Sequence, residues 1–159
     1  MWAGRVGRED AMGHQDANRS SAARLGALAG RLTARDLARA DEGGWTVATL
    51  LLHVAFWDRF VLARWRQALA HGETTPIDVD DDLVDLINDA LGPILASMPA
   101  EAAPAHAVDA ATEVDAAIEG LPARSVEAIA AEGRPRLVDR SLHRIEHLDT
   151  IERLVESRA

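Results

Sequence analysis

The 159-residue chain contains no cysteine, which excludes disulfide bonds and every metal site that depends on thiolate ligands. A transition metal in this protein would therefore have to be held by histidine and carboxylate side chains. Tyrosine is absent too, and aromatic residues make up only 4% of the chain, whereas alanine and leucine are abundant. This composition favours helices over strands.

Positive charge is also scarce. The chain has 17 Lys+Arg residues, all of them arginine, against 26 Asp+Glu residues, and its formal net charge is −9. This balance argues against a nucleic-acid partner, because phosphate binding requires clustered positive charge. No apolar run approaches the ~20 residues of a membrane span, and the residues after Met1 lack the apolar segment of a signal peptide. We therefore expect a cytoplasmic protein without a membrane or nucleic-acid partner.

Apolar residues recur at spacings of three and four along most of the chain, and no segment shows the alternation typical of a strand. This pattern predicts four main helices, with Thr46 as the N-cap of the second, over about residues 14–31, 47–71, 99–119 and 135–156. The long connection over 72–98 contains a shorter helix over about 82–91, interrupted near Gly92 and Pro93. We expect an all-α four-helix bundle with a long crossover connection.

The start of the chain lacks an apolar period, so we expect residues 1–13 to be a flexible N-terminal tail and residues 14–159 to be a single helical domain. Trp2 and Trp65 look exposed in the helical pattern, and apolar surface left over after a bundle forms is typical of a partner surface. This favours a homodimer.

A weak internal repeat relates the two halves of the chain. Residues 32–35 (LTAR) precede a predicted helix that carries His53, and residues 121–124 (LPAR) precede one that carries His143. Chance similarity in a chain rich in alanine and arginine is an equally good explanation.

Three of the six histidines form a candidate metal site. His143 and His147 are four residues apart, so on a helix their imidazoles lie on adjacent turns of one face and can bind one cation. His53 lies in the most apolar predicted helix and should face the core or its edge. The other histidines, His14, His71 and His106, show no such pattern, although His71 is well placed to cap a helix C-terminus.

The same histidines also have purely structural interpretations. A lone core histidine is more often a hydrogen-bonded residue than a ligand, and an i, i+4 pair is often solvated. Three histidine ligands would leave one coordination position open, which is typical of catalytic rather than structural zinc sites. Asp139 could orient His143 as a hydrogen-bond acceptor or form a surface ion pair with Arg136 or Arg140.

Two motifs resemble those of a known family. Residues 44–59 (GWTVATLLLHVAFWDR) are similar to the second-helix motif of the DinB/YfiT-like metalloenzymes, a group that includes the mycothiol-dependent maleylpyruvate isomerases. Residues 143–151 (HRIEHLDTI) are similar to the closing motif of that family. The resemblance covers roughly residues 14–156.

The resemblance implies a four-helix bundle and a metal triad of His53, His143 and His147, holding one divalent ion, nickel or zinc. In the maleylpyruvate isomerase branch the first member of the final pair is typically glutamate, whereas this chain has His143. Activities in the family centre on low-molecular-weight thiols such as mycothiol or bacillithiol. The resemblance therefore implies a small-molecule substrate and a metal-dependent thiol transferase or hydrolase; a metal-binding protein without catalytic activity is the alternative.

Overall fold

The structure is a computed structural model that describes the backbone of residues 3–157 and the side chains from Gly13 onward. Within this part of the chain there is no β-strand, only an isolated bridge between Ala40 and Thr46. The α-helices and two short 3₁₀ helices are, in chain order, α1 (Ala3–Ala29), α2 (Ala34–Leu37), α3 (Val47–Ala70), α4 (Asp81–Ala96), η1 (Ala100–Ala102), α5 (Ala103–Glu119), α6 (Ala123–Ala131), η2 (Pro135–Leu137) and α7 (Ser141–Glu156).

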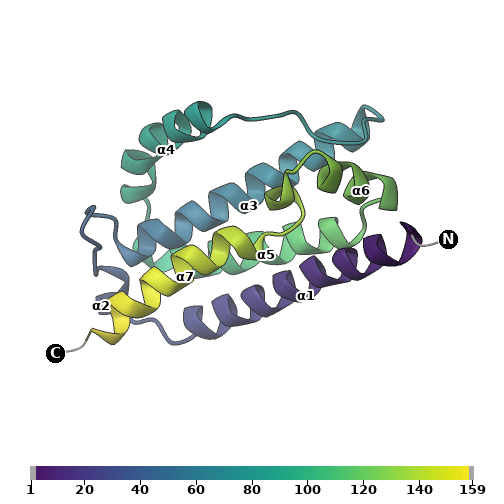
Figure 1. Cartoon of the computed structure of the whole chain (residues 1–159). Coiled ribbons are helices and arrows are strands. Elements are labelled where there is room, and N and C mark those ends of the chain that lie inside the picture. Colours follow the sequence, from purple (N-terminus) through teal and green to yellow (C-terminus); the bar gives the residue numbers. More distant parts are fainter. Residues whose placement is uncertain (1–2, 158–159) are drawn as a thin grey trace.

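Four long helices form the predicted bundle. Helix α3 packs against α5 and α7, and α1 packs against the same two helices, so that α1 and α3 lie diagonally across the bundle (Figure 1). The chain therefore crosses a diagonal twice, through α2 and again through α6. Each half has the order long helix, short helix, long helix, and the second long helix of each half, α3 or α7, is the one that carries His53 or His143.

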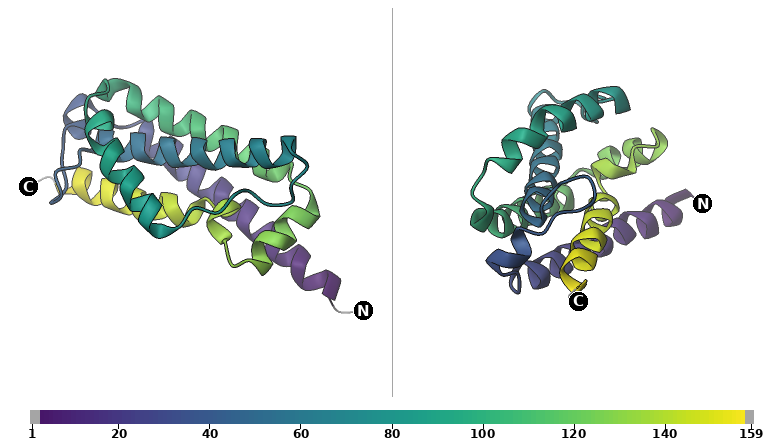
Figure 2. Two further views of the ribbon diagram at one scale, coloured as in Figure 1. Left: turned by 90° about the horizontal axis from the view of Figure 1, so that it is seen from above. Right: turned by 90° about the vertical axis from the view of Figure 1, so that its left-hand side faces the viewer.

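Helix α4 lies in the crossover between α3 and α5, outside the bundle and alongside α3 (Figures 1 and 2). Asp80 caps its N-terminus, where its side chain accepts the backbone N–H of Leu83 at 2.8 Å. The helix continues through Gly92 and Pro93 to Ala96, so the predicted interruption was wrong. A proline removes one hydrogen bond from a helix, and this loss did not end a helix at the solvent-exposed edge of the bundle.

Two other predicted boundaries also differ. Helix α1 begins at Ala3 instead of near His14, while the flexibility of residues 1–13 stays a prediction. The predicted last helix over 135–156 is broken into η2 and α7. Within residues 3–157, none of the helices combines the length and the hydropathy that a membrane-spanning segment requires.

The break before α7 results from contacts that the local sequence does not reveal. Asn18 of α1 accepts the backbone N–H groups of Arg140 and Ser141 at 2.7 and 3.1 Å and donates to the carbonyl of Val138 at 2.8 Å. Asp139 accepts the Ser141 N–H at 3.1 Å and also the Ser141 hydroxyl. These acceptors satisfy N–H groups at the start of α7, which have no partner within the helix.

A buried polar layer divides the core. One apolar cluster includes Leu28, Leu51 and Ile151, and the other includes Trp65 and Ile118.

Trp65 is only 1% exposed, so the expectation that it is exposed was wrong; Trp2 lies outside the described residues. The homodimer stays a prediction, now without Trp65 as support.

Arg144 is at the centre of this polar layer and is fully buried. Its guanidinium bonds Asp115 of α5 through both carboxylate oxygens at 2.8 Å and Asp58 of α3 at 2.9 Å. It also approaches Ser21 of α1 at 3.3 Å. One side chain of α7 thus contacts all three other bundle helices, and Arg140 adds a second ion pair to Asp58 at 2.8 Å.

We expect Arg144→Met to destabilise the fold by ~3–5 kcal/mol, because removing one partner of a buried ion pair leaves its carboxylates uncompensated. The change should be measured as a lower midpoint of urea unfolding. Arg153→Met, at an exposed position of the same helix, is the matched control and should change stability by no more than about 0.5 kcal/mol. Equal midpoints for the two variants would contradict the role assigned to Arg144.

Candidate metal centre

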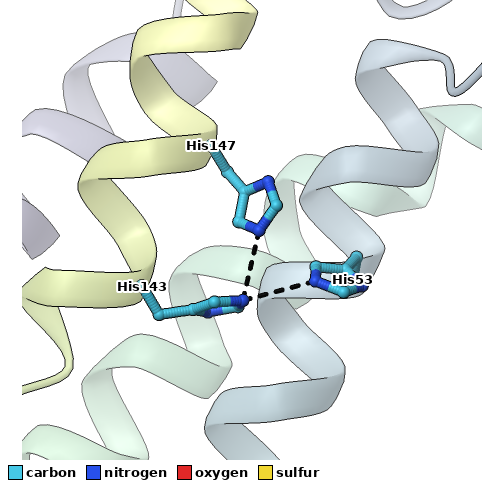
Figure 3. A group of neighbouring side chains, drawn as sticks. All are labelled: His53, His143 and His147. Carbon is cyan, nitrogen blue, oxygen red and sulfur yellow. Dashed lines mark hydrogen bonds between the residues drawn. The ribbon is translucent and has the colours of Figure 1, made fainter. Parts of the chain in front are cut away.

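The three predicted histidines meet between α3 and α7. His53 lies in the N-terminal half of α3, which begins at Val47. Thr46 is the N-cap of this helix, and its side chain accepts the Thr49 N–H at 3.1 Å. His143 and His147 lie on successive turns of α7. Figure 3 shows the three rings pointing toward a common point, with the Nε2 atoms innermost.

The distances between these nitrogens suit one shared ion. His143 Nε2 is 3.3 Å from His53 Nε2 and 3.2 Å from His147 Nε2, and one ligand atom from each residue lies within 4.8 Å of the others. Two nitrogens bound to a tetrahedral metal at ~2.0–2.1 Å are separated by ~3.3 Å. The spacing is therefore that of three ligands around one metal ion.

Hydrogen bonds among the imidazoles alone do not satisfy this cluster. His143 Nε2 faces two other Nε2 atoms but carries at most one proton, so it can donate to only one of them. The Nδ1 atom of His53 is buried and has no hydrogen-bond partner. A cation bound by the three Nε2 lone pairs would satisfy the convergent nitrogens, although it would not contact the Nδ1 atom of His53.

Burial keeps the cluster in the form that binds metal. It lowers the pKa of His53 to about 3, with a smaller contribution from His147. The pKa of His143 is strongly lowered by burial and then by the nearby charge of Arg140, and that of His147 is lowered by burial first. Because only a neutral imidazole can bind a metal, these environments keep the three imidazoles in the protonation state that metal binding requires.

The neighbour of His143 Nδ1 is not the one predicted. Arg140 Nη2 lies 3.4 Å from this atom, whereas Asp139 bonds Ser141. Among the described ion pairs Asp139 takes part in none, so neither the predicted orienting contact nor the predicted surface ion pair is present. Asp139 instead supports the start of α7.

A pocket of about 980 Å³ opens onto the three histidines. Two tryptophans flank His53, with ring centroids 5.2 Å from Trp45 and 6.3 Å from Trp57. Helix α4 forms the opposite wall, where Asn88 accepts the indole N–H of Trp57 at 3.0 Å. The cluster is therefore reachable by a small molecule from one side while the bundle encloses the other.

A comparison with known families places the chain in one of them. A sequence model described as the DinB superfamily matches residues 17–152. The chain belongs to the DinB superfamily. No curated protein and no solved structure shows significant similarity to the chain.

The structure of this DinB-superfamily protein brings the three predicted histidines together, and the pocket also has lining residues that the sequence analysis did not name. Trp57, Val61 and Arg64 follow His53 at helical spacing on one face of α3, so their shared face could have been predicted. Asn88 and Arg140 could not, because they reach the pocket through the crossover and through the break before α7.

The burial of the histidines changes the prediction for their variants. The sequence suggests that only His53 is buried, but the exposed fractions are 6% for His53 and 8% for His143. We therefore expect His53→Ala and His143→Ala to shift the melting temperature of the metal-free protein by similar amounts, and His147→Ala, at a half-buried position, to shift it less. His106→Ala, at an exposed position of α5, is the control. A shift for His53→Ala alone would contradict this.

Proposed function

We propose that this protein binds one divalent metal ion, nickel or zinc, through His53, His143 and His147, and uses it in a metal-dependent reaction of a small molecule. The observation that carries the proposal is the convergence of three Nε2 atoms, from two buried histidines and the half-buried His147, at distances of 3.2 and 3.3 Å at the wall of an open pocket. Three protein ligands leave a position free for a substrate, as in catalytic zinc sites.

The reaction class that we favour is transfer of a low-molecular-weight thiol of the mycothiol or bacillithiol type, with metal-dependent hydrolysis as the other possibility within the same site. When bound, the metal would lower the pKa of a coordinated thiol or water and supply a nucleophile at neutral pH. The chain has no cysteine, so the nucleophile must come from a bound molecule. This fits a pocket large enough for a cosubstrate.

The chain itself contributes apolar walls and proton acceptors. Trp45 and Trp57 cover two sides of His53 and limit its contact with water. Asp41 and Glu146 line the pocket, and both raise the pKa of His147, although burial lowers that pKa by more. Glu146 is held by Arg136 at 3.0 Å. We propose these two carboxylates as acceptors for the proton that a thiol or water would release.

A metal-binding protein without catalytic activity is the second candidate. It is favoured by one observation: the crossover helix α4 covers one side of the pocket and is attached there by the bond from Trp57 to Asn88, an arrangement that would also suit simple retention of a ligand. The cytoplasmic location and the homodimer likewise stay predictions.

We expect the purified protein to contain about one nickel or zinc ion per chain in elemental analysis, or to take up one when the metal is added. Binding to the native state alone should raise the melting temperature with metal concentration. Alanine variants of His53, His143 and His147 should lose this rise, and His106→Ala should keep it. A chain that takes up no metal would refute the proposed site.

Catalysis is tested separately from binding. The metal-loaded protein is assayed for transfer of mycothiol or bacillithiol to an electrophilic acceptor and for ester and amide hydrolysis. We expect turnover that chelation abolishes and that restored metal recovers, with activity lost in His143→Ala. Tight metal binding without turnover on any of these substrates would favour the non-catalytic alternative.

A further inference from the structure

The pocket extends well beyond the histidines, along one face of α3. His53, Trp57, Val61 and Arg64 are spaced by four, four and three residues, and all line it. Eleven residues of helix place the Cα atoms of His53 and Arg64 ~16 Å apart along the axis. The pocket is therefore elongated, with imidazoles at one end, aromatic and aliphatic walls in the middle, and a guanidinium at the other end.

Arg64 has few partners for a charged group that is half-buried. Its Nη2 donates to the carbonyl of Ile77, and its guanidinium carbon lies 5.6 Å from the centre of the Phe60 ring. Its Nε is buried without a hydrogen-bond partner. Among the residues that the structure describes, no carboxylate lies within ion-pair distance of Arg64.

The other arginines that line the pocket are different, because each has an acidic partner. Their ion pairs are Arg134 with Asp78 at 3.4 Å and Glu132 at 2.7 Å, Arg136 with Glu146 at 3.0 Å, and Arg140 with Asp58 at 2.8 Å. Arg64 is therefore the guanidinium of this pocket that has no ion-pair partner among the described residues.

Arg64 also lies close to another positive charge. Arg134 Nη2 donates to the same Ile77 carbonyl at 2.8 Å, so two guanidiniums meet at one oxygen. Burial lowers the pKa of Arg64, and the charges of Arg134 and Arg140 lower it further, while Asp78 acts in the opposite direction. An anion placed beside Arg64 would relieve this repulsion.

We propose that Arg64 is a carboxylate-binding subsite that recognises the far end of an elongated ligand whose other end lies at the three histidines. A guanidinium presents a planar fork of donors that matches a carboxylate. The ligand class is a small molecule with an apolar middle section and a terminal carboxylate. This inference rests on the proposed function, because the metal site positions the first end of that ligand.

The test compares mercaptooctanoate with mercaptooctanol, two probes of equal chain length that differ in the terminal anion. Their dissociation constants are measured by calorimetry with the zinc-loaded and the metal-free full-length protein. The variants are Arg64→Gln, Arg64→Lys and Arg66→Gln; Arg66 is exposed on the same helix and does not line the pocket. Melting curves check that each variant is folded.

We expect the parent and Arg66→Gln to bind the carboxylate about tenfold more tightly than the alcohol. Arg64→Gln should lose this preference, and Arg64→Lys should keep part of it. Equal affinities for the two probes in the parent, a preference that survives in Arg64→Gln, or no binding of either probe would overturn the subsite. If the protein takes up no zinc, the proposed function fails, while the preference in the metal-free protein still decides the subsite.

Discussion

The buried ion pairs of Arg144 are the constraint on which the arrangement of this bundle depends. Removing a guanidinium and two carboxylates from water costs several kcal/mol per ion, and the cost is offset only if every hydrogen bond is made. Arg144 makes these bonds with Asp115 and Asp58 on two other helices. Apolar contacts tolerate small slips between helices, whereas this network fixes the register of α7 against α3 and α5.

That register also positions the candidate metal centre. His143 is the residue before Arg144, and when Arg144 points into the bundle at Asp58 the preceding side chain faces α3 at the level of His53. Arg140, one turn earlier, bonds Asp58 and approaches His143. The charged layer and the imidazole cluster thus lie on two faces of the same turn of α7. A shift of Arg144 should therefore also move His143.

The pocket depends on a different part of the chain. The crossover helix α4 packs against α3 and leaves space beside the histidines that the four-helix core itself would not provide. A closed bundle buries its histidines as structural residues, whereas this one has a long groove that begins at the imidazoles and ends at Arg64. The fold therefore combines a bundle that carries the candidate metal-binding histidines with a peripheral helix that forms one wall of the pocket.

The sequence by itself determined the helical class and the four main helices, because helical periodicity is a local property of the chain. The i, i+4 spacing of His143 and His147 likewise predicted that the two share one helix face. The resemblance of its two motifs predicted the family.

Contacts between residues distant in sequence decided the other features of the fold and the pocket. Asn18 of α1 accepts the N–H groups of Arg140 and Ser141 at the start of α7, which periodicity alone placed at Pro135. Trp65 was expected at the surface, but it lies in the core, where its indole N–H donates to the Leu137 carbonyl at 2.7 Å. Arg64 became a pocket residue only because the chain beyond α3 and the turn before η2 fold back over its end. Such partners lie 13 or more residues apart in the sequence, so only the packed structure identifies them.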